Sequence, residues 1–252
     1  MNLDSVISKT DLIIRMNSPL DDPIGEAILD FNQSKKPAEI IVSSDICDDD
    51  VIDVAYLFRS YDDMPEIEKM ALDLCDGTIL DVGAGSGIHA TLLKERGKNV
   101  KCIDISKKSV KHMLDIGLNA QDIDFLNYSG EQFDTLLLLM NGIGIAGSLD
   151  RLESFLKHAL TLLKPGGKIL CDSTDIKYLY QDDDGEIWID LNSDYYGNFK
   201  FQMKYKDQIS NWFDWLYVDF ESLSSTAKNI GFETVKLIEE DNHYLAELKF
   251  TK

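Results

Sequence analysis

The sequence predicts an α/β fold: a doubly wound, mostly parallel seven-stranded sheet that closes with a C-terminal antiparallel strand pair. From Pro65 to Asp172, short apolar runs alternate with helical patterns, which is typical of βαβ units. The apolar runs are almost continuous, as in parallel strands that helices cover on both faces. An N-terminal helical cap and a β-hairpin insertion complete the predicted fold.

The cap is expected over residues 1–64, ahead of a domain over residues 65–252. Proline residues punctuate the cap, with a helix expected over Gly25–Asn32 and a short strand over Ile40–Val42. Three aspartates precede a second predicted helix, Val51–Phe58, because acidic residues favour a helix N-terminus.

Strands and helices alternate through the domain, and glycine or proline ends most of the helices. Residues 181–219 interrupt this order with an aromatic antiparallel insertion, in which Ile187–Asp190 and Phe199–Tyr205 are predicted strands. The predicted strands of the sheet are Thr78–Val82, Asn99–Asp104, Ala120–Ile123, Thr135–Met140, Lys168–Asp172, Glu233–Glu239 and Tyr244–Phe250. The predicted helices are Pro65–Cys75, Ile88–Arg96, Ser106–Asp115, Ser148–Leu163 and Phe220–Asn229.

The net charge of −20 argues against two classes of partner. A field of that sign repels phosphate backbones and anionic membrane surfaces, so neither nucleic acid nor a membrane is expected as a partner. No apolar run is long enough to span a bilayer, and no secretory signal is seen. The four cysteines lie far apart without a CxxC pair, so no metal is expected. These features favour a cytoplasmic protein with reduced thiols. The sequence does not reveal the oligomeric state, and either a monomer or a homodimer is expected.

The run Ile79–Gly87 is an apolar strand followed directly by a glycine loop that opens a helix. Glycines there adopt backbone angles closed to other residues and let a ligand approach the main chain. The spacing is GxGxG rather than the GxGxxG of dinucleotide loops, and Asp81 precedes it. A carboxylate there repels a pyrophosphate but suits a ligand with an ammonium group. The loop residues expected to contact the ligand are Gly83, Ala84, Gly85 and Gly87.

Two more acidic residues end the next strands. Asp104, followed by Ile105, can accept both hydroxyls of a ribose, although capping the helix near Ser106 is an alternative role. Asp122, followed by Ile123, is suited to an adenine amino group and ring. Ammonium, ribose and adenine groups together match one ligand.

These segments resemble the class I, Rossmann-like S-adenosylmethionine-dependent methyltransferases. Asp81–Gly87 is similar to their first motif, Asp104 to their ribose acid and Asp122 to their adenine-contacting acid. Phe133–Gly142 resembles their fourth-strand segment, whose tip faces the methyl group, and Leu162–Gly167 resembles the turn into their fifth strand. The resemblance is strong from about residue 65 to 175, while the cap and insertion resemble small bacterial methyltransferases of unassigned substrate.

The resemblance implies that S-adenosylmethionine is the cofactor and that Met140 and Asn141 lie near its methyl group. It implies methyl transfer by in-line displacement, with S-adenosylhomocysteine as product. The resemblance assigns no acceptor, and a small molecule is expected from the acidic charge and the aromatic insertion. The sequence lacks the (Asn/Asp)-Pro-Pro-Tyr signature of enzymes that methylate amide or exocyclic amine nitrogens. A non-catalytic S-adenosylmethionine-binding or partner module, and a different Rossmann enzyme linked to NAD or a nucleotide sugar, remain alternatives.

The remaining candidate residues each have a structural alternative. Arg59 and Tyr61 could grip the cofactor carboxylate or pack on the surface. No catalytic residue is identified, and the candidates are Asn141, Asp172 and His89, of which Asp172 could form a turn and His89 could be a solvated first-turn residue. Aromatic residues of the insertion are expected to line an acceptor pocket or to cover one face of the hairpin. They are Tyr195, Tyr196, Trp212 and Trp215.

Overall fold

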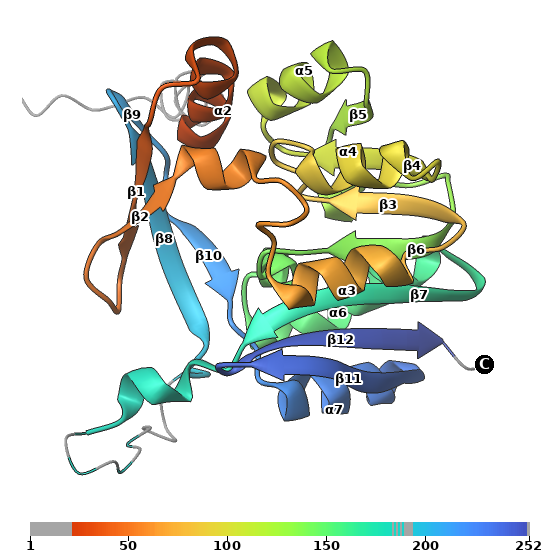
Figure 1. Cartoon of the computed structure of the whole chain (residues 1–252). Helices are drawn as coiled ribbons and strands as arrows, with labels where there is room; N and C mark the ends of the chain where they lie inside the picture. The colour runs from red at the N-terminus through yellow and green to blue at the C-terminus, as the bar shows by residue number, and fades with distance from the viewer. Residues whose placement is uncertain (1–21, 183, 185, 187, 189–193, 251–252) are drawn as a thin grey trace, which may run out of the picture.

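The computed structural model describes residues 22–182, 184, 186, 188 and 194–250, which form two sheets (Figure 1). Five strands of the larger sheet are parallel, and its last two are antiparallel to their neighbours. The predicted doubly wound sheet and its closing antiparallel pair are therefore confirmed. In spatial order its strands are β11 (Phe232–Glu240), β12 (His243–Phe250), β7 (Leu163–Thr174), β6 (Phe133–Leu138), β3 (Thr78–Val82), β4 (Asn99–Asp104) and β5 (Asn119–Asp122).

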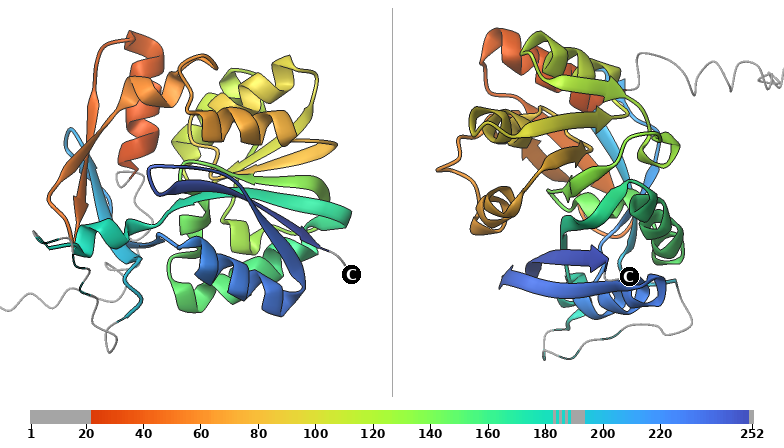
Figure 2. Two further views of the ribbon diagram at one scale, coloured as in Figure 1. Left: turned by 60° about the horizontal axis from the view of Figure 1, so that its bottom comes forward. Right: turned by 90° about the vertical axis from the view of Figure 1, so that its right-hand side faces the viewer.

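Helices cover both faces of this sheet (Figure 2). Alternate residues of a strand point to opposite faces. On β6, Leu137 packs with α3 (Glu66–Leu74), while Leu136 and Leu138 pack with α6 (Leu149–Thr161). Three other helices complete the two layers: α4 (Ile88–Glu95) and α5 (Lys107–Asp115) on the α3 side, and α7 (Phe220–Ile230) beside α6. Burial on both faces explains why the strands are apolar along their whole length.

The carboxyl ends of β3, β4, β6 and β7 meet at one edge of the sheet, which we call the carboxyl edge. Because β12 runs antiparallel to β7, with His243 opposite Thr174, the turn between β11 and β12 lies at the same edge. In Figure 1 the arrowheads of β3, β6 and β7 point toward the second sheet. In open α/β sheets, ligands bind outside such an edge.

The second sheet joins the N-terminal segment to the insertion. Its strands, all antiparallel, are β2 (Asp50–Asp53), β1 (Glu39–Ser44), β8 (Asn198–Tyr205) and β10 (Phe213–Leu216), with β9 (Gln208–Ile209) beside β8. Val42 of β1 lies opposite Met203 of β8. Two segments that the sequence treats separately therefore build a common sheet.

The N-terminal segment contains more strand than the predicted helical cap. Its first predicted helix is present as α2 (Pro23–Ser34), and the short predicted strand lies within β1. The predicted helix Val51–Phe58 is wrong in its first part, which belongs to β2, and only Val54–Phe58 forms a 3-10 helix, η1. Ile52 pairs with Ile40, so β-branched residues enter a sheet ladder that local helix signals do not reveal.

The insertion contains the predicted strand Phe199–Tyr205 within β8, but its partners differ from the prediction. One edge of β8 pairs with β1 and the other with β9 and β10, so the hairpin runs downstream through Lys206. The other predicted strand, Ile187–Asp190, lies outside the described residues except for Trp188, which is not in a strand.

The second sheet and α2 are fixed to the domain through the start of α5. Lys108 forms an ion pair with Glu26 at 2.6 Å, and Ser106 Oγ donates a hydrogen bond to Asp22 at 2.7 Å. Across the described part of the chain, no helix has the length and apolar character needed to cross a membrane.

Candidate functional site

The glycine loop between β3 and α4 has the backbone that its sequence requires. Gly83, Gly85 and Gly87 have φ angles of +69°, +57° and +75°, which side chains strongly disfavour. A Cβ at Gly85 would have no atom closer than 4.0 Å, so the main chain there is open to a ligand. At Gly87, a Cβ would lie 2.6 Å from Leu118, so this glycine permits packing against the loop after α5. Ala84 between them is buried.

Asp81 is a buried carboxylate with an unused oxygen. Its side chain lies on β3 just before the loop, and within the described residues Oδ2 has no hydrogen-bond partner. Burial raises the pKa of Asp81 to about 6, with the charge of Asp104 adding to the shift and His89 opposing it. A buried carboxylate oxygen without a partner destabilises the folded protein unless a ligand donates a hydrogen bond to it. A ligand ammonium group would do so.

Asp104 braces the loop rather than capping a helix. Its Oδ2 accepts a hydrogen bond from Gly85 N at 2.8 Å, and its Oδ1 accepts one from Ser106 N at 2.7 Å. The N-cap of α5 is Ser106 itself. Burial raises the pKa of Asp104, while these backbone N–H groups oppose the shift. Each carboxylate oxygen can accept a further bond, so ribose hydroxyls could still be held.

Asp122 and Ile123, the two residues expected near an adenine, lie at the end of β5, and Ile105, expected to contact the cofactor, directly follows β4. Asp122 is directly opposite Asp104 in the strand register, and Ile123 N donates to Asp104 O at 3.0 Å. Ile105 is 76% exposed, although it is a large apolar side chain. An exposed isoleucine beside an exposed acid provides an apolar surface and a hydrogen-bond acceptor for a base.

The end of β6 is strained. Met140 and Asn141 both have left-handed backbones, with φ angles of +63° and +57°. Residues other than glycine pay about 1–3 kcal/mol for such conformations, which cluster at functional sites. Asn141 Nδ2 donates to Leu216 O at 3.1 Å, and its buried Oδ1 has no partner in the described structure. The strain and the unused acceptor fit a role at the methyl group.

Arg59 belongs to a buried ionic cluster. One guanidinium nitrogen pairs with Glu68, another donates to Tyr56 O at 2.6 Å, and Nε has no partner among the described residues. Glu68 Oε2 is also 2.7 Å from His89 Nε2. His89 is therefore buried rather than solvated, because Glu68 on α3 draws it inward. Burial opposes ionisation of Glu68, but the two bonds lower its pKa.

Tyr61 is not brought to the glycine loop. Its hydroxyl lies 3.4 Å from Asp73 on α3, and the Arg96 guanidinium stacks on its ring at 4.5 Å. These contacts agree with the expectation that Tyr61 packs on the surface rather than binding the cofactor carboxylate.

Asp172 lies at the carboxyl edge and bonds to a histidine that the sequence analysis missed. The Asp172 side chain is fully buried, with Oδ1 accepting from Gly142 N at 3.1 Å and Oδ2 lying 2.7 Å from His243 Nε2. The one available signal for His243 was the Asp241-Asn242 turn, because that turn must lie at this edge.

Trp215, one of the aromatic candidates, contacts the turn after β6. This turn is a 3-10 helix, η3 (Gly142–Ala146), and a Cβ at Gly144 would lie 2.3 Å from Trp215 Nε1. Trp212 is half exposed on the connection into β10.

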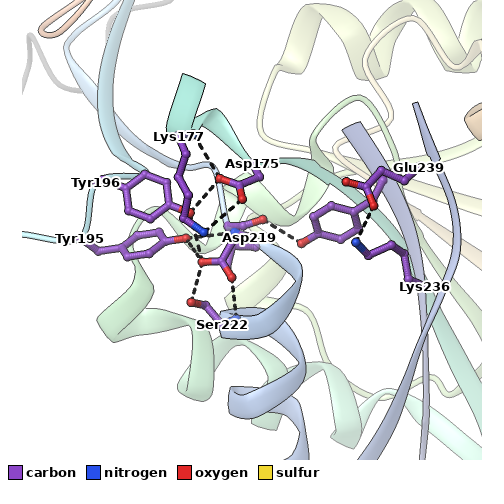
Figure 3. Close-up of polar contacts among 10 residues, drawn as sticks. Asp175, Lys177, Tyr195, Tyr196, Asp219, Ser222, Lys236 and Glu239 are labelled. Carbon is purple, nitrogen blue, oxygen red and sulfur yellow. Dashed lines mark hydrogen bonds and ion pairs between the residues drawn. The ribbon is translucent and has the colours of Figure 1, made fainter. Parts of the chain in front are cut away.

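Tyr195 and Tyr196 instead join a polar network at the start of α7 (Figure 3). Tyr195 Oη donates to Asp219 at 2.6 Å, and Tyr196 Oη donates to Asp175 at 2.9 Å. Asp219 caps α7, so these tyrosines fasten the insertion to the domain. Burial raises the pKa of both hydroxyls.

The carboxyl edge thus combines an open glycine loop, a buried unpaired acid and an exposed apolar surface. The buried unpaired acid, Asp81, fits the ammonium group of S-adenosylmethionine. Asp104 beside the glycine loop fits the ribose, and Asp122 with the exposed Ile105 fits the adenine. The described residues contain no group of three or more His, Cys, Asp or Glu side chains that could hold a metal ion.

The chain is similar to known methyltransferases. A family model described as a methyltransferase domain matches residues 80–171. The crystal structure of an S-adenosylmethionine-dependent methyltransferase from Bacteroides fragilis, in complex with S-adenosyl-L-homocysteine, is 42% identical with a TM-score of 0.87. That match covers 94% of this chain and 98% of the other.

Two curated relatives match a shorter stretch. The cypemycin N-terminal methyltransferase of a Streptomyces species is 31% identical over 103 residues, which is 39% of this chain and 42% of the relative. The ubiquinone biosynthesis O-methyltransferase of Rickettsia conorii is 29% identical over 105 residues, or 40% and 36% of the two chains. The chain thus spans less than half the length of these relatives. Together with the full-length structural match, they show that the chain belongs to the S-adenosylmethionine-dependent methyltransferases, with S-adenosylmethionine as its cofactor.

Proposed function

We propose that the protein transfers a methyl group to a small apolar or aromatic acceptor by in-line displacement. The observation that carries this proposal is the contact between Trp215 and Gly144. It brings the second sheet against the turn that follows Met140 and Asn141, where the resemblance expects the methyl group.

The side of the second sheet that carries Trp215 is aromatic. Phe199 and Phe201 alternate along β8, and Trp215 and Phe213 of β10 lie opposite them, so all four share one face. Phe201, Phe213 and Trp215 are only half-buried. A half-buried aromatic face beside the carboxyl edge suits a flat or apolar small molecule. A charge of −20 disfavours a nucleic acid in the same place.

The bound cofactor supplies a methyl group on a sulfonium sulfur, which is already activated for displacement. In this proposal Asp81 holds the ammonium group, Asp104 the ribose and Asp122 the adenine, while the free Nε of Arg59 is available to the carboxylate. The second sheet excludes water and aligns the acceptor with the end of β6. Orientation of this kind can supply about 7–11 kcal/mol of the barrier.

The names of the curated relatives describe two different acceptors, an N-terminus and an oxygen, so they support methyl transfer without favouring one acceptor chemistry. A module that binds the cofactor without catalysis remains the alternative. The strained backbone at Met140 and Asn141 favours an enzyme, because a silent binding module has no need of strain beside the methyl position.

The test uses the purified protein, cofactor labelled with tritium on the methyl group, and a low-molecular-weight metabolite extract. Label is expected in an organic product, with S-adenosylhomocysteine formed in equal amount. If calorimetry detects S-adenosylhomocysteine binding but no label leaves the cofactor, the binding-module alternative holds instead.

The pocket is tested with the acceptor found in this way. Trp215→Ala is expected to raise the KM for the acceptor and to leave S-adenosylhomocysteine affinity unchanged. Trp188→Ala, at a side chain that is 73% exposed, is the matched control. An unchanged KM in Trp215→Ala would exclude the aromatic face as the acceptor site.

A further inference from the structure

A histidine and a buried aspartate form a pair at the carboxyl edge. His243 begins β12 directly after the Asp241-Asn242 turn, and its Nε2 lies 2.7 Å from Asp172 Oδ2. Asp172 is fully buried, and its other oxygen accepts the Gly142 N–H at 3.1 Å. Both oxygens of the carboxylate are therefore engaged, which fixes its orientation and, through it, that of the imidazole.

The pair is close to the place where methyl transfer is proposed. Gly142 directly follows Asn141, so Asp172 is one hydrogen bond away from the strained end of β6. The same turn carries Gly144, on which Trp215 packs. An acceptor held between Trp215 and the end of β6 would therefore lie beside this edge.

The imidazole of His243 is held on one side and open on the other. Its side chain is 32% exposed, and no described residue forms a hydrogen bond with Nδ1. His89, which pairs with Glu68, is by contrast buried. One nitrogen oriented by a carboxylate and the other accessible is the arrangement of a general base.

The charges around His243 suit this role. Burial lowers the pKa of His243, but the hydrogen bond and charge of Asp172 raise it more, and Glu68 on α3 and Glu240 on β11 add to the rise. Burial raises the pKa of Tyr56 on η1, and the charges of Glu68 and Asp172 add to the rise. Tyr56 therefore lies in the same surroundings as His243. A base with a pKa near neutrality is best matched to catalysis at neutral pH.

We propose that His243 is the catalytic base that takes the proton from the acceptor, and that Asp172 is its positioning residue. This proposal rests on the function proposed above. The acceptor lone pair forms the new bond to the methyl carbon, and the electrons of the broken carbon–sulfur bond stay on sulfur. The proton leaves the acceptor for Nδ1 of His243, and the resulting imidazolium is stabilised by Asp172 until water removes the proton.

The proposal restricts the class of acceptor. Its nucleophilic atom carries a proton at neutral pH, as in a hydroxyl or an N–H group. A thiolate or a tertiary amine needs no base, so the pair would have no role with such an acceptor.

The main test is His243→Gln, because the glutamine amide can still donate to Asp172 but cannot take up a proton. With the acceptor from the labelled extract, kcat is expected to fall about 10²–10⁴-fold at neutral pH. The KM and the S-adenosylhomocysteine affinity should stay unchanged. The matched control is His158→Gln, at a half-buried histidine on α6 that bonds to Phe125 O.

Two pH measurements accompany this variant. The pKa of His243 is measured by NMR in the ligand-free protein and should lie above the ordinary value for histidine. The kcat of the unmodified protein should fall as the pH drops through that pKa, because only the neutral imidazole accepts a proton. Asp172→Asn should lower the NMR pKa and move this fall in kcat to lower pH.

The outcomes separate the two proposals. If the unmodified protein transfers label and His243→Gln retains its kcat and pH profile, the base is disproved while the methyltransferase function stands. An equal loss of kcat in His158→Gln also disproves the role of His243 as the base. The same holds if Asp172→Asn leaves the pKa of His243 unchanged. If the unmodified protein transfers no label at all, both proposals fail.

Discussion

Replacing Asp81 with asparagine is expected to stabilise the ligand-free protein while weakening its affinity for S-adenosylhomocysteine. Burial raises the pKa of Asp81 from 3.8 to about 6. At 1.36 kcal/mol per pKa unit, ionisation of the folded protein at this site costs about 3 kcal/mol. Because the folded pKa lies above the unfolded one, the full cost applies above pH 6 and disappears as the pH falls below 4.

The variant removes this cost but buries an amide instead. Burying an unpaired amide lowers the free energy of unfolding by about 1 kcal/mol or more. We therefore expect a net gain of about 1–2 kcal/mol in the free energy of unfolding at pH 8. At pH 4 the ionisation cost is nearly absent while the cost of the buried amide remains, so the variant should be no more stable than the unmodified protein there. Urea titrations at the two pH values measure the difference.

The same substitution should weaken binding. Asp81 is proposed to bond the ligand ammonium group, and a charge-assisted bond contributes about 1.5–3 kcal/mol, or about 10–150-fold in Kd. In the unmodified protein, binding below pH 6 should release a proton, so affinity falls as the pH drops. Calorimetry in two buffers of different ionisation enthalpy detects that proton.

The control is Asp76→Asn, at an exposed residue before β3, whose carboxylate forms an ion pair with Lys98 at 3.5 Å. It should leave affinity and proton release unchanged. If Asp81→Asn binds S-adenosylhomocysteine as tightly as the unmodified protein, with the same pH dependence, the assigned role of the buried carboxylate is refuted.

Three further substitutions address packing around the site. Glu68→Gln leaves the buried Arg59 guanidinium without its carboxylate, so urea denaturation should show a loss of about 3–5 kcal/mol. Gly144→Ala places a Cβ 2.3 Å from Trp215 Nε1, which should cost about 1–3 kcal/mol and shift the tryptophan fluorescence. Tyr195→Phe removes a hydroxyl that bonds the cap of α7, which should cost about 1–3 kcal/mol at unchanged S-adenosylhomocysteine affinity.

Two exposed positions serve as controls for this group. Glu66→Gln, in an exposed pair with Lys69, should change stability by about 0.5 kcal/mol or less. Tyr178→Phe, at a half-exposed ring, should behave like the unmodified protein. If the three buried substitutions lower the free energy of unfolding no more than the two controls do, the contacts described are contradicted. An unshifted fluorescence spectrum in Gly144→Ala would also contradict them.

Features encoded by neighbouring residues were predictable from the sequence. The bounds Thr78–Val82 and Asn99–Asp104 agree with β3 and β4, because apolar runs ended by turn residues are local signals. The glycine loop and the acids that end successive strands also follow from local order. Parallel strands share one carboxyl edge, so chain order alone brings Asp81, Asp104 and Asp122 to it.

Local signals failed where a distant partner decided the structure. Val51 and Ile52 follow acidic residues that favour a helix, yet they form a strand because β1 offers them a ladder. Helix propensity amounts to tenths of a kcal/mol per residue, which a sheet partner readily outweighs.

The sequence by itself therefore determined the parallel sheet, its closing antiparallel pair and the glycine loop after β3. Tertiary structure alone decided that β1 pairs with β8, that Glu68 joins Arg59 to His89, and that His243 meets Asp172. Periodicity states which side of an element is buried, but not which side chain from elsewhere in the chain lies opposite. The polar contacts that complete the site depend on such long-range partners, so they appear only in the folded protein.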